Sequence, residues 1–293
     1  MARRKVVNYT LLKGFDYYIP AWGGIFALIG LLLLGVLIGG AVMLLLGAVM
    51  PKESVDTYGL LITYPFQFIP AMIFCSLKSR DNAMFDQGIA LNSRHFGRTG
   101  GWVLGLAVVL ATISAAYMTD IITKWLPDMP AYLEDLLKGM TGGPLWVSLL
   151  SVSVMAPFFE EWLCRGEIMR GLLSRVKPVW AIVISAAFFA IIHLNPWQAI
   201  PAFILGCLFG YVYYKTGSLL LTMLMHCANN TFSVIITRLD AFQDADTWLD
   251  VLSPMEYFAG FVAAALVIIA LVLLLRRIPL EHPAGNLDPV EAK

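Results

Sequence analysis

The sequence predicts an all-α fold, a polytopic transmembrane helical bundle of about eight spanning helices with both termini in the cytoplasm. Hydrophobic residues make up 59% of the chain and charged residues only 14%, and the mean hydropathy is +0.76. These values lie outside the range of soluble globular domains. The apolar residues gather into eight runs, and most Lys and Arg residues lie on one side of those runs. The net charge of zero gives no sign of nucleic-acid binding.

The eight apolar runs predict the helices in chain order. Crossing the hydrocarbon core of a bilayer takes about 20 residues, so the fifth and sixth runs look short. The connections are too short to hold another folded domain, and the two longest, 78–100 and 124–143, have room at most for interfacial helices. The runs comprise residues 21–45, 58–77, 101–121, 144–163, 179–194, 199–214, 219–237 and 255–275.

These runs divide the chain into three parts. We expect residues 1–143 to form scaffold helices, 144–238 a catalytic core, and 239–293 a last transmembrane helix with a short cytoplasmic tail. The first run is too long for the apolar part of a cleavable signal peptide, so we expect none. The four cysteines lie in or beside apolar runs without CxxC spacing, which indicates reduced thiols and not a disulfide framework.

The basic residues predict the orientation. Cytoplasmic connections of membrane proteins are enriched in Lys and Arg. When successive runs cross the membrane in opposite directions, 16 of the 20 basic residues lie on one side of it. We therefore expect an integral, multi-pass protein of the cell membrane with both termini inside. The 16 are Arg3, Arg4, Lys5, Lys13, Lys78, Arg80, Arg94, Arg98, Arg165, Arg170, Arg175, Lys177, Lys215, Arg276, Arg277 and Lys293, and the other four are Lys52, Lys124, Lys138 and Arg238.

Two adjacent glutamates near the end of the fourth run indicate a functional site. Residues 156–170 read APFFEEWLCRGEIMR, and an ionised carboxylate deep in a bilayer costs at least a few kcal/mol, so such groups usually face a protein cavity. Glu161 and Arg165 are four residues apart and share a helix face, so we expect them to pair. Glu160 points about 100° away from that face.

Two later runs each add a histidine at a similar depth. At about 1.5 Å per residue, Glu160, His193 and His226 lie about 15, 24 and 16 Å from the cytoplasmic anchors Arg170, Lys177 and Lys215, respectively. These depths are near the middle of a hydrocarbon core about 30 Å thick. Asn230 lies one turn beyond His226 and shares its face. Phe189 lies one turn before His193, where its ring would form a wall of the site.

These groups suit the hydrolysis of a peptide bond without a covalent intermediate. Glu160 or His193 is placed to take a proton from a water molecule. His226 and Asn230 are placed to donate hydrogen bonds to the developing oxyanion. The sequence has no HExxH motif for a metalloprotease and no GxSx-type serine with an activating base.

Three short motifs carry a family resemblance. Glu160-Glu161-x-x-x-Arg165, Phe189-x-x-x-His193 and His226-x-x-x-Asn230 resemble the signature motifs of the CAAX-prenyl-protease and bacteriocin-processing family of intramembrane glutamic endopeptidases. The resemblance covers about residues 148–237. It implies an all-helical membrane fold with the site open to the cytoplasm. It also implies a membrane-embedded or lipid-anchored protein substrate, which in eukaryotic members is a prenylated CAAX protein.

The resemblance leaves the role of a metal open. Members of the family have been described both as zinc metalloproteases and as enzymes in which glutamate activates water directly. We expect no metal and no other cofactor. A zinc ion held by His193 and His226 is the alternative, because two histidines and two carboxylates are suitable zinc ligands.

Two other function classes fit parts of the sequence. In a proton-coupled transporter the Glu and His residues would form a proton relay, but the polar groups are confined to three runs and no inverted repeat is visible. In a non-catalytic scaffold or immunity protein of the same fold, the Glu161–Arg165 pair would only neutralise itself, and Asn230 would only join helices.

Overall fold

The computed structural model describes residues 11–83, 88–93, 96–242, 245 and 247–280. Five of the basic residues used to predict the orientation, Arg3, Arg4, Lys5, Arg94 and Lys293, lie outside these ranges, and the orientation in the membrane remains a prediction. Throughout the described residues the chain is helical and contains no β-strand, which confirms the all-α prediction.

Twelve α-helices follow one another in the described residues, joined by short connections and by stretches of 3-10 and π-helix. Their bounds are α1 (Trp22–Val49), α2 (Lys52–Asn82), α3 (Gly101–Asp120), α4 (Ala131–Gly142), α5 (Leu145–Ser148), α6 (Ala156–Glu161), α7 (Arg170–Leu173), α8 (Pro178–Ile191), α9 (Pro196–Thr216), α10 (Leu219–Ile236), α11 (Trp248–Val251) and α12 (Pro254–Arg276).

Seven helices in the described part of the chain are long and apolar enough to cross a membrane. Each of the eight predicted runs is helical, but the fifth, α8, has only 14 residues. At about 1.5 Å per residue it is about 21 Å long, shorter than the hydrocarbon core. The sixth, α9, is longer than predicted because it begins at Pro196, where the side chain of Asn195 caps it by accepting from the backbone N–H of Gln198.

The fourth run forms one continuous helix, 145–173, which includes α5, α6 and α7. The predicted end at Leu163 is therefore ten residues too early. The charged residues that follow Leu163 suggested that the helix leaves the apolar layer there. In the structure Arg165, Glu167 and Arg170 are all buried and paired, so the helix continues through them.

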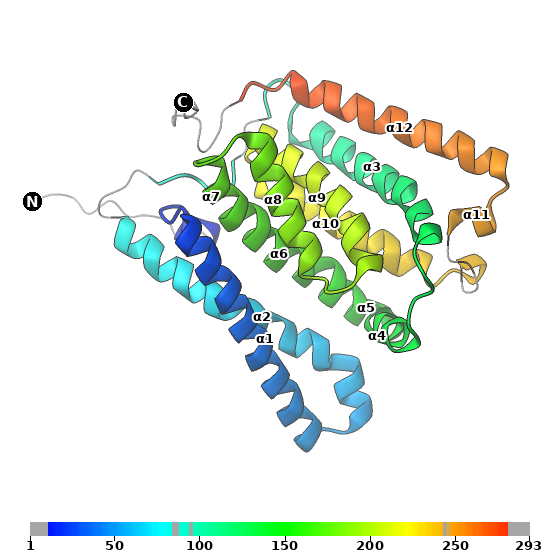
Figure 1. Cartoon of the computed structure of the whole chain (residues 1–293), viewed down its shortest axis with the longest axis horizontal. Helices are drawn as coiled ribbons and strands as arrows, with labels where there is room; N and C mark the ends of the chain where they lie inside the picture. Colours follow the sequence, from blue (N-terminus) through cyan, green and yellow to red (C-terminus); the bar gives the residue numbers. More distant parts are fainter. Residues whose placement is uncertain (1–10, 84–87, 94–95, 243–244, 246, 281–293) are drawn as a thin grey trace, which may run out of the picture.

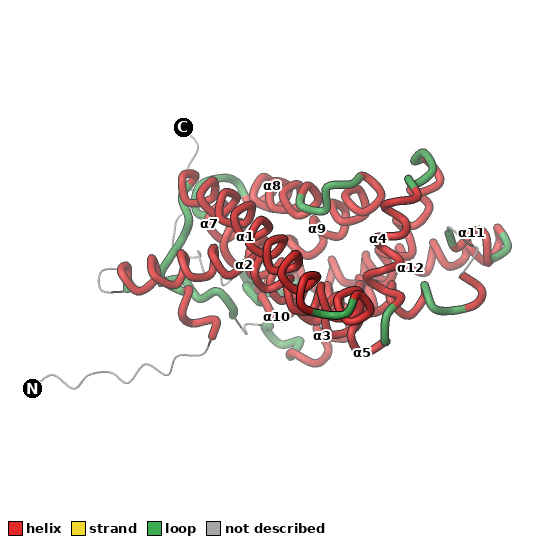
Figure 2. The backbone as a smooth tube through the Cα atoms, turned by 90° about the horizontal axis from the view of Figure 1, so that it is seen from below, coloured by secondary structure: helices red, strands yellow, loops and turns green. Residues whose placement is uncertain are grey.

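The helices form a bundle with one hairpin at its side (Figures 1 and 2). α1 and α2 pack along each other, and their closest approach is at Gly35, where any side chain would collide with the backbone carbonyl of Gln67. α3 and α12 lie side by side at the opposite edge (Figure 1), and α6 to α10 lie between the two pairs. The central helices are therefore covered by protein on both sides.

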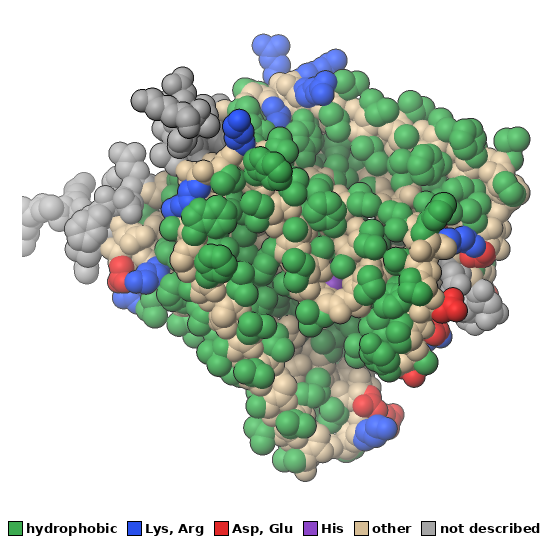
Figure 3. All heavy atoms as spheres, viewed as in Figure 1, with side chains coloured by type: hydrophobic (Ala, Val, Ile, Leu, Met, Phe, Trp, Pro, Cys, Tyr) green, Lys and Arg blue, Asp and Glu red, His purple; other side chains and the backbone are tan. Residues whose placement is uncertain are grey.

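Hydrophobic side chains cover most of the molecular face shown in Figure 3, whereas the Lys, Arg, Asp and Glu side chains lie near its margins. α1 and α12 both expose many large apolar residues, among them Leu37, Leu44 and Leu266. Apolar surface of this extent is unusual for a soluble monomer and is expected where a protein contacts lipid. The structure thus supports a multi-pass integral membrane protein.

Candidate active site

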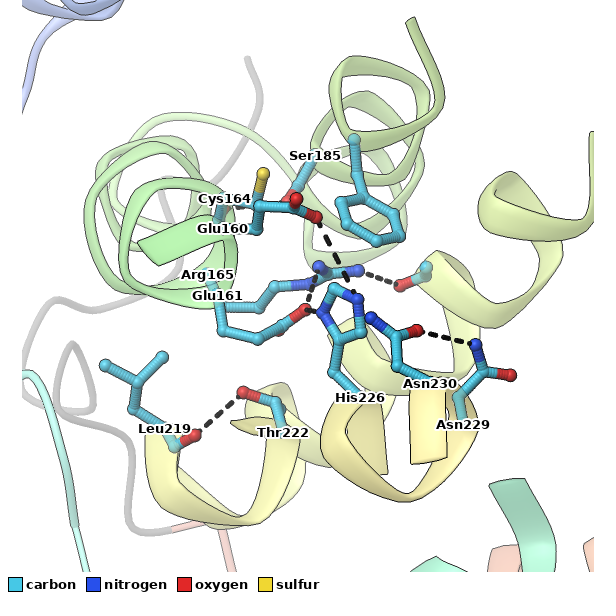
Figure 4. A network of polar contacts seen from close by, with 12 residues as sticks. Glu160, Glu161, Cys164, Arg165, Ser185, Leu219, Thr222, His226, Asn229 and Asn230 are labelled. Atoms are coloured by element: carbon cyan, nitrogen blue, oxygen red, sulfur yellow. Dashed lines mark hydrogen bonds and ion pairs between the residues drawn. The ribbon is translucent and has the colours of Figure 1, made fainter. Parts of the chain in front are cut away.

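Glu161 joins two helices through one oxygen atom (Figure 4). Arg165 Nη1 donates to Glu161 Oε1 at 2.7 Å, and His226 Nδ1 lies 3.1 Å from the same oxygen. All three side chains are buried. An ionised carboxylate only accepts hydrogen bonds, so Nδ1 of His226 carries the proton in this contact. The Glu161–Arg165 pair predicted from the spacing is confirmed, while the contact with His226 was not predicted.

Arg165 has polar and aromatic partners besides Glu161. Its Nη2 donates to the backbone carbonyl of Gly206 at 3.0 Å, and its guanidinium lies over the rings of Phe189 and Phe209 at 4.6 and 5.4 Å from their centroids. A Cβ atom at position 206 would lie 3.2 Å from Nη2, so glycine leaves room for this contact. Cation–π contacts of this kind stabilise a desolvated guanidinium. The cation is therefore a permanent neighbour of Glu161.

Glu160 lies on a different face of the helix, as its position in the sequence predicts. One carboxylate oxygen, Oε1, accepts a hydrogen bond from the hydroxyl of Tyr64 on α2. The other, Oε2, is buried, forms no hydrogen bond with the described residues, and lies 3.9 Å from His226 Nε2. This separation is too long for a direct hydrogen bond and short enough for both atoms to contact one bound oxygen atom.

Tyr64 is the site residue that the sequence analysis missed. It lies outside the three motifs, in a helix that we expected to be only scaffold. Its sequence signal is weak, since a tyrosine in an apolar helix commonly lies at the membrane surface. Only the packing of α2 against α6 shows that its hydroxyl reaches Glu160.

His193 lies in the turn between α8 and α9, one residue beyond the cap of α8. Its Nδ1 lies 2.8 Å from the carbonyl oxygen of Phe189, which can only accept, so Nδ1 donates and Nε2 is left as the free ring nitrogen. The Phe189 ring meets both imidazoles edge-on, at 5.1 Å from His193 and 5.3 Å from His226. In the described part of the chain no recorded contact joins His193 directly to Glu160.

Asn230 extends the site along α10, one turn beyond His226 (Figure 4). Its amide nitrogen donates to the carbonyl of Val152 at 2.8 Å, and its amide oxygen accepts from Asn229 at 3.1 Å. One hydrogen of the amide group is thus engaged with the helix that carries the glutamates, and the second is left for another acceptor. Asn230 therefore both joins two helices and retains a donor.

The expectation that the site holds no metal remains a prediction. Among the described residues no group of three or more His, Cys, Asp or Glu side chains is arranged to hold a metal ion. His193 and His226, the two residues that would share a zinc ion, both contact the ring of Phe189.

Comparisons with known proteins point to one family. Residues 142–232 match the model of the type II CAAX prenyl endopeptidase Rce1-like family. The chain is also 25% identical over 150 residues to the UPF0177 protein YxdF of Lactococcus lactis subsp. lactis (strain IL1403), an alignment that covers 48% of this chain and 79% of that protein. No solved structure matches the chain significantly. The matched region contains every site residue described above except Tyr64.

Proposed function

We propose that this multi-pass membrane protein, whose residues 142–232 match the model of the type II CAAX prenyl endopeptidase Rce1-like family, is a peptidase that hydrolyses a peptide bond of a membrane-associated protein. The substrate class that fits the family best is a lipid-anchored protein of the prenylated CAAX type. The observation that carries the proposal is the pair formed by Glu160 Oε2 and His226 Nε2, two buried atoms 3.9 Å apart.

In the proposed reaction Glu160 is the general base. A water molecule bound at Oε2 transfers a proton to the carboxylate as its oxygen attacks the carbonyl carbon of the substrate. In the tetrahedral intermediate the attacking oxygen and the oxyanion are bonded to the same carbon atom. A general base that contacts the first oxygen and a hydrogen-bond donor that contacts the second can therefore lie a few ångströms apart. The protonated Glu160 next gives its proton to the leaving nitrogen as the C–N bond breaks, and the carboxylate is restored.

His226 and Asn230 are proposed to stabilise the oxyanion. Since Nδ1 of His226 donates to Glu161, donation from Nε2 requires the imidazolium form. Asn230 adds its second amide hydrogen. Donors held in place before the reaction stabilise a developing charge without reorganising.

His193 is proposed, from its motif, to share the activation of water with Glu160. Its Nε2 is the ring nitrogen left to accept a proton, since Nδ1 donates to the backbone of its own helix. The turn that carries it is held by Asn195, whose amide donates to the carbonyl of His193 and to the side chain of Gln198. The Phe189 ring contacts both imidazoles.

The proposal is tested with the purified protein in liposomes and a fluorescence-quenched CAAX peptide carrying a farnesylated cysteine. We expect cleavage at one bond, identified by product masses, and slower cleavage of the same peptide without the lipid. We also expect activity after rigorous chelation and well under one equivalent of zinc in the active protein. Zinc that is lost and restored together with activity would instead make His193 and His226 metal ligands.

The natural substrate can be identified in cells that produce the protein. Terminal-peptide mass spectrometry of deletion and wild-type cells should reveal new protein termini that depend on the chain. Peptide-coupled proton flux without hydrolysis would contradict the proposal and favour a transporter. An absence of cleavage in both experiments would favour a non-catalytic member of the family.

A further inference from the structure

Tyr64 approaches the site from α2, outside the region that matches the family model. Its hydroxyl donates to Glu160 Oε1, across 96 positions of sequence. Its ring packs against Phe68 and Phe159, with centroids 5.5 and 6.4 Å away, and those two rings are stacked on each other at 5.2 Å. The aromatic contacts hold the phenol where its hydroxyl meets the carboxylate.

The hydrogen bond sets the direction of the Glu160 carboxylate. The last torsion of a glutamate side chain has a broad profile, so packing alone defines it poorly. With Oε1 bound to Tyr64, the other oxygen lies 3.9 Å from His226 Nε2 and has no hydrogen-bond partner in the described residues. One oxygen is thus anchored and the other is free for the reaction.

The position of Tyr64 depends on how closely α2 packs. Gly35 of α1 lets the backbone of α2 approach at Gln67, three residues beyond Tyr64. Pro65 lies directly after Tyr64 and has no N–H, so the carbonyl of Leu61 loses its helical partner and the helix can bend there. Gly35 and Pro65 therefore allow α2 to pack closely against α1 and to bend next to Tyr64.

We propose that Tyr64 is a positioning residue, which holds Glu160 Oε1 so that Oε2 faces His226 and the reacting water. This inference rests on the proposed function. It extends the site from the three family motifs to the α1–α2 hairpin. Loss of a hydrogen bond to a charged partner at this position should lower the cleavage rate about 10- to 100-fold.

Tyr64→Phe is the direct test, because it keeps the ring and removes only the hydroxyl. We expect kcat for the farnesylated peptide to fall about 10- to 100-fold, with KM nearly unchanged since the substrate contacts remain. Tyr58→Phe is the matched control. It removes the same atom from the same helix, from a ring that contacts Trp146 and not Glu160, and should behave as wild type.

The pH–rate profile adds a readout that a purely structural role would not move. Around the Glu160 carboxylate lie Tyr64 on α2, His226 on α10, and Glu161, Cys164 and Arg165 on its own segment. Tyr64→Phe removes a hydrogen-bond donor from this carboxylate, so the profile should change in Tyr64→Phe and stay unchanged in Tyr58→Phe. 3-Fluorotyrosine at position 64 keeps the shape of the side chain and donates a stronger hydrogen bond, so the profile should change in the opposite direction.

Infrared spectroscopy separates this inference from the proposed function, because it needs no substrate. The carboxylate band of Glu160, identified by its loss in Glu160→Gln, should shift in Tyr64→Phe and stay in place in Tyr58→Phe. An unshifted band, or wild-type kcat and pH profile in Tyr64→Phe, would overturn the positioning role. If wild-type protein cleaves nothing, the proposed function fails, while the infrared result still decides whether Tyr64 orients Glu160.

Discussion

Glu161 Oε1 is shared by a guanidinium on its own helix and an imidazole on α10. The sequence predicted the first contact, because residues four apart share a helix face. It did not predict the second, since spacing within one helix says nothing about which residue of another helix comes near. The same limit explains why Tyr64 and the Gly206 carbonyl were missed, although each contacts a residue that the motifs identify.

Replacing Glu161 should damage both stability and chemistry. Glu161→Gln leaves the buried Arg165 without its counter-charge, and losing one partner of such a pair costs about 3–5 kcal/mol. It also removes the carboxylate that orients His226. We expect a lower melting temperature together with a lower cleavage rate.

The double variant Glu161→Gln with Arg165→Met separates the two effects. It removes the uncompensated charge, so part of the lost stability should return, while His226 still lacks its carboxylate and the rate should stay low. A stable, merely inactive Glu161→Gln together with an unfolded Glu160→Gln would show that the two glutamates have the opposite roles.

At the scale of elements, the helix of residues 145–173 is not a regular α-helix. π-helical stretches at Leu149–Met155 and Trp162–Met169 flank α6, which carries both glutamates. Wide turns of this kind occur frequently at functional sites. Pro157 at the start of α6 lacks the N–H that would continue a regular ladder. The sequence pattern predicted a helix here but not the wide turns, because both have similar hydrophobic spacing over one or two turns.

A second buried ion pair fastens this helix to the start of the chain. Arg170 donates to the backbone carbonyls of Phe15, Tyr18 and Ile89 at 2.9, 2.6 and 2.7 Å, and lies 3.4 Å from Glu167 Oε2. The sequence analysis placed Arg170 at the cytoplasmic surface, which is wrong, since its side chain is buried. One guanidinium thereby holds three backbone carbonyls of two separate segments, residues 15–18 and residue 89, against this helix.

Arg170→Met should therefore loosen segments 12–20 and 88–91. We expect faster amide hydrogen exchange in those segments and a lower melting temperature, because three carbonyls and the buried Glu167 lose their donor. Arg175→Met is the control, since Arg175 donates only to Gly171 and Ser174 nearby in the chain. Equal exchange in the two variants would contradict this role of Arg170.

At the scale of the whole molecule, the bundle has two chemically different ends. At one end Arg170 meets residues 15–18 and 89, and Lys215 Nζ donates to the carbonyl of Ile278. At the other, Lys124 pairs with Asp250 at 2.6 Å, and Arg238 donates to the carbonyl of Gly143. Which of the two ends faces the cytoplasm remains a prediction.

Single-cysteine labelling in a cysteine-free background tests the orientation. An impermeant thiol reagent added to intact cells should label a cysteine at Lys138 and should not label one at Arg98, because the excess of basic residues retains the Arg98 side in the cytoplasm. Labelling at Arg98 but not at Lys138 would reverse the arrangement.

The helical type of the apolar runs was predicted well from the sequence, because long apolar runs are a strong signal in a membrane protein, and seven helices, against the eight predicted, are long enough to span. The helix ends were predicted less well: α8 is too short to span, and the fourth helix continues through charged residues that are paired inside the protein. The division into residues 1–143, 144–238 and 239–293 remains a prediction, and the Tyr64 contact shows that the first part also reaches the site.

The measurement that tests the central claim most directly is the cleavage rate of Glu160→Gln, with its melting temperature as the control for folding. The glutamine keeps an amide oxygen for Tyr64 but cannot accept a proton from water. The account predicts a loss of more than about a hundredfold in rate, in line with general-base catalysis, at an unchanged melting temperature. A variant that cleaves the farnesylated peptide at the wild-type rate would contradict it.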